Sequence, residues 1–199
     1  MNDQYFTREP GSASRPVPCS FSYRGCALTF ETDSGVFSRG ELDEGSRLLL
    51  DALPPLRGPV LDVGCGWGAL GVSIARANPE ARVTMGDVNL RALELCRKNA
   101  ERNGTSVRVL ESDGLSALAG ETFDTVVTNP PIRAGKQVVY RILAEALGAL
   151  NPGGSLYLVI RKQQGAESCL RYLKSLGAGA ERVSRSAGYW VIRAGMNES

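Results

Sequence analysis

The chain has 199 residues, of which 43% are hydrophobic and 22% charged, a composition typical of one folded globular domain. No apolar run approaches the roughly 20 residues of a membrane-spanning helix, and the polar N-terminus shows no signal peptide. The sequence contains no histidine. This excludes Ser-His-Asp and Cys-His catalysis, histidine-bearing zinc sites and a histidine general base.

The cysteines and the charges indicate the compartment and the kind of partner. The five cysteines include no Cys-x-x-Cys pair, so neither a disulfide framework nor a metal site is expected, and the location is expected to be the reducing cytoplasm. The net charge is only +2, but residues 133–199 carry ten Lys and Arg against four Asp and Glu. Such a basic segment suits a polyanion such as RNA, although an ordinary solvated surface explains it equally well.

The N-terminal part is expected to form an arm and a small extension. Residues 1–18, which include three prolines, predict an extended arm ahead of a single domain over residues 19–195. Within that domain, residues 19–56 predict a hairpin, with strands at 19–23 and 27–32, followed by a helix that Pro54-Pro55 end. Ser38 and Glu41 have the spacing of a capping box and predict the start of that helix.

Residues 57–195 are expected to form the core of the domain, because strands and helices alternate along them. Strands are predicted at 60–63, 81–86, 107–110, 123–127, 155–160, 180–184 and 189–193, and helices at 69–77, 89–103, 138–150 and 166–176. The alternation predicts a Rossmann-like α/β fold with a seven-stranded, mostly parallel sheet and helices on both faces. A short link joins the last two strands, so one terminal strand must be antiparallel. The run Asn-Pro-Gly-Gly at 151–154 is expected to form a loop.

A glycine-rich turn follows the first core strand, with the sequence Asp62-Val-Gly-Cys-Gly-Trp-Gly68. Glycines let the backbone approach a ligand closely. Asp62 would repel a pyrophosphate but suits a cationic ligand, which disfavours NAD-dependent redox chemistry. Asp87 lies 23 residues after Gly64, the spacing of a carboxylate that accepts hydrogen bonds from ribose hydroxyls. Asp113, at the end of the third strand, is expected either to accept from an adenine amino group or to cap a helix.

The tetrapeptide Asn129-Pro-Pro-Ile132 follows the fourth core strand. Two successive prolines continue neither a sheet nor a helix, so they predict a rigid, extended loop with free carbonyls at the carboxyl edge of the sheet. The amide oxygen of Asn129 and the carbonyl of Pro130 can both accept from one NH2 group. A planar conjugated amine is a poor nucleophile because its lone pair is delocalised, and two such acceptors pull it towards a tetrahedral shape.

Together, the glycine turn, Asp87 and the Asn-Pro-Pro motif resemble class I S-adenosylmethionine-dependent N-methyltransferases. More closely, the chain resembles the methyltransferase small domain family, which includes small-subunit rRNA guanine-N2 methyltransferases. The similar stretches are residues 34–38, 129–136, 161–166 and 188–190, and the resemblance covers about residues 5–195. Members of this rRNA group often carry a second, degenerate domain ahead of the catalytic one, which these 199 residues do not include.

The resemblance implies a role for each motif residue. The cofactor, S-adenosylmethionine, would be bound by Asp62, Gly64, Cys65, Gly66, Asp87, Val88, Asp113, Gly114 and Asn129. Asn129 and Pro130 would be catalytic because they bind the target amine. Substrate contacts are expected from Phe37, Pro131, Ile132, Arg133, Lys136, Arg161 and Lys162. The four cations are expected to contact phosphates.

Two positions depart from the family pattern. Ile132 stands where an aromatic residue often stacks on the base, so Phe37 is the expected stacking ring. Trp67 replaces a more usual Tyr and is expected to change only the packing.

The sequence therefore predicts an N-methyltransferase that acts on the exocyclic N2 amine of a guanine in small-subunit (16S) rRNA. One alternative is an acceptor amine on a protein glutamine or a small molecule. A second is a non-catalytic, cofactor-dependent RNA-binding module, against which the intact Asp62, Asp87 and Asn129 argue. The sequence predicts neither the target nucleotide nor the oligomeric state.

Overall fold

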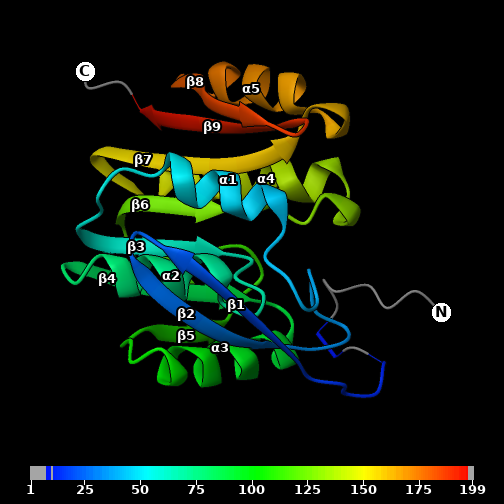
Figure 1. The fold of residues 1–199 in the computed structure, drawn as a ribbon. Coiled ribbons are helices and arrows are strands. Elements are labelled where there is room, and N and C mark those ends of the chain that lie inside the picture. Colours follow the sequence, from blue (N-terminus) through cyan, green and yellow to red (C-terminus); the bar gives the residue numbers. More distant parts are fainter. Residues whose placement is uncertain (1–7, 10, 197–199) are drawn as a thin grey trace.

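The computed structural model describes residues 8–9 and 11–196, and it consists of a seven-stranded sheet with an added two-stranded hairpin (Figure 1). Residues 1–7 and 10 of the expected arm lie outside the described residues. The hairpin consists of β1 (Val17–Tyr23) and β2 (Cys26–Thr32). The strands of the large sheet are β3 (Gly58–Val63), β4 (Ala81–Asp87), β5 (Arg108–Glu111), β6 (Phe123–Thr128), β7 (Leu150–Arg161), β8 (Ala178–Ser186) and β9 (Tyr189–Met196).

The large sheet has the strand order β5-β4-β3-β6-β7-β9-β8. The five strands from β5 to β7 are parallel, whereas β9 is antiparallel to both β7 and β8. The predicted mostly parallel sheet with an antiparallel terminal strand is confirmed. The strand order reverses between β3 and β6, which is the place where open α/β sheets bind their ligands.

Helices cover both faces of this sheet. One face carries α1 (Glu44–Ala52), α2 (Ala69–Ala77) and α3 (Leu90–Arg102), and the other carries α4 (Lys136–Gly148) and α5 (Ala166–Ser175) (Figure 1). Neighbouring residues of one strand, such as Val60 and Leu61, are fully buried in different cores. Strands covered on both faces read as continuous apolar runs, which explains these sequences. No helix in the described part of the chain is long and apolar enough to cross a membrane.

Asn99 of α3 and Asn103, the residue that follows this helix, fix the hairpin to the core. Asn99 Oδ1 accepts from the backbone N–H of Glu31 at 2.7 Å, and Asn99 Nδ2 donates to the Glu31 carbonyl at 2.9 Å. Asn103 makes the same pair of hydrogen bonds with Thr29, at 3.0 and 2.8 Å. The two amides thus take the place of a neighbouring strand along the edge of β2 and satisfy its backbone groups. This docking fixes where the chain leaves the hairpin towards α1.

Helix α1 begins later than the sequence predicted. Asp43 is its N-cap residue, because Asp43 Oδ1 accepts from the backbone N–H groups of Gly45 and Ser46 at 3.0 and 3.2 Å. Ser38 has a φ of +55°, whereas an N-cap residue is extended, and its hydroxyl donates to the Glu41 carbonyl at 2.7 Å. The predicted capping box is therefore wrong, because residues 38–42 form bends and turns ahead of the helix.

Strand β7 begins earlier than predicted. Residues 151–154, expected to form a loop, belong to the strand, and the register against β6 shifts between Phe123 and Thr125. A Cβ at Gly154 would lie 2.8 Å from the carbonyl oxygen of Asn151. Glycine therefore permits a close backbone approach here, and an irregular strand replaces the expected loop.

Candidate active site

A cavity of about 380 Å³ lies at the carboxyl edge of the sheet, beside the switch in strand order between β3 and β6. It is lined by the segments that follow β3, β4, β5 and β6, and by the segment that leads from the hairpin to α1. It brings together these predicted site residues: Phe37, Gly64, Cys65, Gly66, Asp87, Val88, Asp113, Gly114, Asn129, Pro130 and Pro131.

The glycine turn presents its backbone to open space. Gly64 and Gly66 have φ values of +71° and +55°, a region that favours glycine, and no atom lies within 4 Å of the position a Cβ would take at either residue. The N–H groups of Gly64 and Cys65 both donate to the Gly86 carbonyl, at 2.9 and 3.0 Å. The turn is thereby fixed to the end of β4, with room for a ligand beside it.

Asp87 holds this turn in place from the end of β4. Its Oδ2 accepts from the Gly66 N–H at 2.8 Å, and its Oδ1 accepts from the Asn89 N–H at 2.9 Å. Burial raises the pKa of Asp87 above the usual aspartate value. Each carboxylate oxygen retains further acceptor capacity, so Asp87 can also accept hydrogen bonds from the hydroxyls of a ligand in the cavity.

Asp62 lies behind the turn and does not line the cavity. It is completely buried, its Oδ2 accepts from the Gly71 N–H at 2.9 Å, and its Oδ1 has no hydrogen-bond partner among the described residues. Burial raises the pKa of Asp62 to about 7, and the negative charge of Asp87 adds to this effect. A buried carboxylate oxygen without a partner is costly, so the site favours a cationic group nearby.

Asp113 is held by a cation that the sequence analysis missed. Its Oδ1 accepts from Arg141 Nη2 at 2.6 Å, and Arg141 also donates to Glu145 at 2.9 Å. Glu145 in turn accepts from the backbone N–H of Leu115 at 3.0 Å. Within the described part of the chain, no group donates to the second carboxylate oxygen of Asp113, and the side chain is 65% exposed. Arg141 lines the cavity. The only feature of the sequence that pointed to Arg141 was its position four residues before Glu145, the spacing of an ion pair on a helix.

Asn129, at the end of β6, has its amide nitrogen turned towards α1. Its Nδ2 donates to Ser46 Oγ at 3.1 Å and lies 3.4 Å from each carboxylate oxygen of Asp43. Asp43 and Ser46 both line the cavity. No sequence motif marked these two residues as part of the site.

The carbonyls of the two prolines after Asn129 each accept a backbone hydrogen bond. The Pro130 carbonyl accepts from the Ile132 N–H at 2.8 Å, and the Pro131 carbonyl accepts from the Ala134 N–H at 2.9 Å. The prediction of free carbonyls is wrong, because a 3-10 turn (Ile132–Ala134) begins at once. A carbonyl oxygen has two lone pairs, so Pro130 can still accept a second hydrogen bond.

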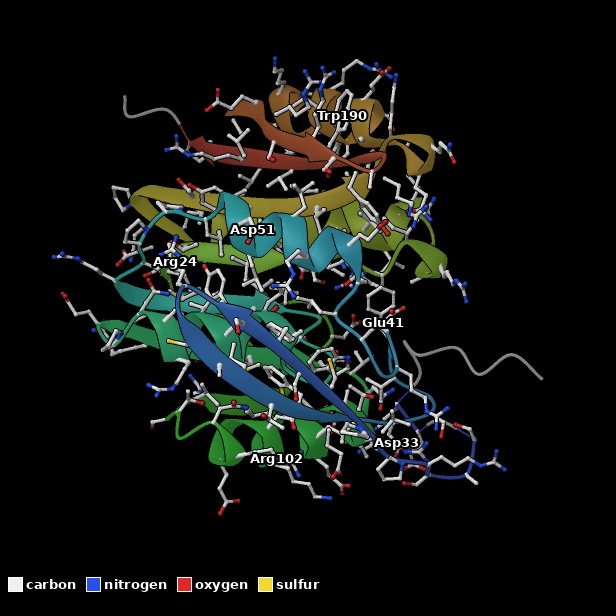
Figure 2. The ribbon with its side chains drawn as sticks, in the orientation of Figure 1. Arg24, Asp33, Glu41, Asp51, Arg102 and Trp190 are labelled. Carbon is white, nitrogen blue, oxygen red and sulfur yellow. The ribbon has the colours of Figure 1, made fainter. Side chains whose placement is uncertain are left out.

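Residues 33–43 connect the hairpin to α1 beside the glycine turn, and Figure 2 labels Asp33 at the start of this segment and Glu41 near its end. Trp67 Nε1 donates to the Phe37 carbonyl at 2.9 Å and lies 3.2 Å from the Ser38 carbonyl. Besides its packing, Trp67 therefore fastens this segment through its indole N–H. The Phe37 side chain lines the cavity while remaining 38% exposed.

The other predicted substrate residues lie outside the cavity lining. Ile132 packs against the core on the α4 and α5 face. Four cations are exposed around the same edge of the sheet: Arg133, Lys136, Arg161 and Lys162. Lys136 and Arg161 lie over the rings of Tyr140 and Tyr189, with the charged group 5.1 and 4.5 Å from the ring centre, and Lys162 pairs with Glu167 at 3.7 Å.

Comparison with known proteins identifies the family. The model of the methyltransferase small domain matches residues 27–193. The chain belongs to the methyltransferase small domain family. The Bacillus subtilis protein YbxB is 42% identical to this methyltransferase over 98% of each chain.

Other relatives carry functional names. The ribosomal RNA small subunit methyltransferase C of Vibrio cholerae is 40% identical over 75% of this methyltransferase and 43% of its own length. The T. thermophilus 16S rRNA N2 methyltransferase, solved with AdoMet and guanosine, has a TM-score of 0.82 at 31% identity and covers 94% of this chain. The match covers 51% of that protein, so the chain spans about half the length of these named relatives.

The cavity of the methyltransferase fits S-adenosylmethionine, the cofactor of the family. The cofactor carries an ammonium group, and Asp62, buried behind the glycine turn, has a carboxylate oxygen without a partner among the described residues. The cofactor also carries a ribose, and Asp87 offers it a carboxylate at the edge of the cavity. The open backbone of Gly64 and Gly66 leaves room between these two acidic groups.

Proposed function

We propose that this methyltransferase transfers a methyl group from S-adenosylmethionine to the exocyclic N2 amine of a guanine in 16S rRNA. The observation that carries the proposal is that Asn129 and Pro130 line the same cavity as Gly64 and Asp87. An amine held by the first pair would face a cofactor held by the second. The named activity of the rRNA methyltransferases that match this domain supports guanine N2 as the acceptor.

The acidic ends of three strands are the proposed cofactor contacts. Asp87 accepts from the ribose hydroxyls, and the turn from Gly64 to Gly66 lies along the methionine part, with the buried Asp62 behind this turn attracting the ammonium group. Val88, Asp113 and Gly114 surround the adenine, and one oxygen of Asp113 stays with Arg141. The bound cofactor supplies a methyl group activated by its positively charged sulfur.

The residues of the Asn-Pro-Pro loop prepare the acceptor. Asn129 Oδ1 and the remaining lone pair of the Pro130 carbonyl accept hydrogen bonds from the two hydrogens of the target amine. This pairing localises the nitrogen lone pair and aims it at the methyl group, so positioning and fixed dipoles supply most of the rate. The methylated amine is briefly acidic and loses its proton to water, so the chain needs no histidine.

The rim of the cavity is the proposed binding surface for RNA. The half-exposed ring of Phe37 stacks on the target base, and Pro131 and Ile132 shape the loop on the other side. The four exposed cations, Arg133, Lys136, Arg161 and Lys162, contact backbone phosphates. An rRNA acceptor also implies that the protein works in the cytoplasm.

Transfer of labelled methyl groups tests the proposal. Purified protein is offered naked 16S rRNA, small ribosomal subunits, total tRNA and a protein fraction, and the labelled nucleosides are identified by mass spectrometry. We expect N2-methylguanosine in 16S rRNA from the wild type and from Asn151→Ala, a control at the opposite edge of the sheet. Asn129→Ala should lose at least about 100-fold in rate while binding the cofactor normally.

Two results would replace the proposal by one of the alternatives. Label found only in protein or in small molecules would show a different acceptor amine. No label in any fraction, with cofactor and RNA both bound, would show a non-catalytic binding module.

A further inference from the structure

The side-chain amide of Asn129 can take only one of its two orientations, the one with its oxygen towards the cavity. Its nitrogen lies against two groups of α1, the hydroxyl of Ser46 at 3.1 Å and the carboxylate of Asp43 at 3.4 Å. Within the described residues, no donor contacts Asn129 Oδ1. A carboxylate only accepts hydrogen bonds, so rotation of the amide by half a turn would place its oxygen against the oxygens of Asp43. Asp43 therefore determines which amide atom remains for a ligand.

The first turn of α1 is itself fixed in two ways. Asp43 Oδ1 caps the helix by accepting from Gly45 and Ser46, so the carboxylate has a defined direction. Gly45 lies close against β9, since a Cβ at this residue would come within 2.8 Å of the Tyr189 ring. The position of Asp43 and Ser46 is thus set by the sheet that also carries Asn129, and the three side chains keep a constant relation.

We infer that Asp43 and Ser46 are positioning residues for methyl transfer, which hold the Asn129 oxygen towards the target amine. The inference rests on the proposed function, in which that oxygen accepts from the amine. The reversed amide would point its own NH2 group at the acceptor NH2 group, so that two donors would meet and the nitrogen lone pair would stay delocalised. Neither residue contacts the cofactor in this scheme, so their effect falls on the rate of transfer.

Variants of Asp43 separate this role from its role as a helix cap. Asp43→Ser keeps a good N-cap residue, so α1 should remain stable, but the shorter side chain no longer reaches Asn129. Asp43→Asn keeps the cap and the length of the side chain, but its NH2 group can pair with the oxygen of a reversed Asn129 amide. Ser46→Ala removes the shorter hydrogen bond alone. Asp51→Ser, on the last turn of the same helix (Figure 2), is the matched control.

We expect Asp43→Ser to lower the single-turnover rate by about 10- to 100-fold, the range expected for a misplaced catalytic group. The affinity for S-adenosylhomocysteine, the KM for RNA and the melting temperature should stay near the wild-type values. Asp43→Asn should also lower the rate, because it no longer excludes the reversed amide. Ser46→Ala should lose less than Asp43→Ser, and Asp51→Ser should match the wild type. A rate unchanged in Asp43→Ser or in Asp43→Asn would overturn the inference.

A second measurement does not depend on activity. The side-chain amide signals of Asn129, assigned by their loss in Asn129→Ala, should move in the nitrogen–proton NMR spectrum of Asp43→Ser and stay in place in Asp51→Ser. Signals that do not move in Asp43→Ser would overturn the positioning role. A wild-type protein that transfers no methyl group would overturn the proposed function instead.

Discussion

The parallel strands of the sheet end at one edge, but the side chains at that edge differ on the two sides of the boundary between β3 and β6. The ends of β3, β4 and β5 carry the carboxylates of Asp62, Asp87 and Asp113, which we call the acidic half. The segment after β6 carries Asn129, and the end of β7 carries the exposed cation Arg161; we call this side, with its other exposed cations, the basic half. The cavity lies where the two halves meet.

The two halves also hold their charges in different ways. Asp62 is buried and Asp87 accepts two backbone N–H groups, so both carboxylates are fixed before a ligand arrives. Arg161 is exposed and lies over the ring of Tyr189, so its charge remains in water. A fixed, enclosed charge suits a small cationic cofactor, whereas exposed cations suit a long polyanion. The comparison predicts that variants of each half change one ligand and spare the other.

The largest effect is expected for Asp87→Ala in the acidic half. The variant loses both the acceptor for the ribose and the anchor of the Gly66 N–H, so its affinity for S-adenosylhomocysteine should fall by about 100-fold. Asp113→Ala should cost only about threefold, because that side chain is exposed and held by Arg141. Calorimetric titration measures both values, with Asp124→Ala at the far edge as the control. Equal losses at Asp87 and Asp113 would contradict this ranking.

A smaller effect is expected for Phe37→Leu. This variant tests whether the Phe37 ring contacts the RNA or the cofactor. The variant keeps the backbone carbonyl that accepts from Trp67 but loses the stacking surface, so kcat/KM for RNA should fall by about tenfold. The affinity for S-adenosylhomocysteine should stay within twofold. A loss of cofactor affinity in place of RNA affinity would assign Phe37 to the acidic half.

The pH dependence of cofactor binding follows from the raised pKa of Asp62. Below a pKa of about 7, the free protein carries a proton on Asp62 that must leave before the carboxylate can face an ammonium group. Binding of S-adenosylhomocysteine should therefore strengthen by about tenfold from pH 6 to pH 8 and release a proton. By the same linkage, Asp62 makes the free protein less stable as the pH rises from about 4 to 7.

Calorimetry in two buffers of different ionisation enthalpy counts the released proton. Asp62→Asn should bind more weakly and release no proton from this position. If binding to the wild type neither releases a proton nor varies with pH, Asp62 does not face the ammonium group.

The smallest effect is expected in the basic half, where each cation is exposed. The double variant Arg161→Gln, Lys162→Gln should raise the KM for RNA by about three- to tenfold. The slope of the logarithm of RNA affinity against the logarithm of salt concentration should fall by the amount expected for the loss of about two phosphate contacts. The affinity for S-adenosylhomocysteine should not change. Filter binding at several salt concentrations measures the slope, and Arg57→Gln, whose ion pair with Glu80 lies near the start of β3, is the control. An unchanged slope would remove both residues from the RNA surface.

Most of the fold could be predicted from the sequence because strands and helices alternate strongly along it. The predictions failed where a tertiary contact decides the local structure. Ser38 and Glu41 have the spacing of a helix cap, yet the Trp67 indole and the turns after Ser38 move the start of the helix to Asp43. Residues 151–154 read as a loop, yet the sheet incorporates them with a shift of register.

The residues on the cofactor side of the site could be predicted from the sequence better than those on the acceptor side. Gly64, Gly66 and Asp87 follow a pattern set within one β-α-β unit, formed by β3, α2 and β4, so their spacing in sequence determines their geometry. Asp43 lies 86 residues from Asn129 along the chain, and only the packing of α1 on the sheet brings them together. Arg141 reaches Asp113 across 28 residues for the same reason. Short-range patterns in the sequence do not predict contacts between residues so far apart along the chain.

The docking of the hairpin has a consequence for how this enzyme can change. On β2, Asn99 and Asn103 bond only to main-chain atoms, so these hydrogen bonds do not depend on the side chains of that strand. The hairpin is also joined to the glycine turn, because Asn99 donates to the Trp67 carbonyl at 2.8 Å and the buried Phe30 ring packs against the Trp67 ring. A hairpin grafted from another member of the family would therefore keep the docking hydrogen bonds, but its residue at position 30 would have to fit the Trp67 ring.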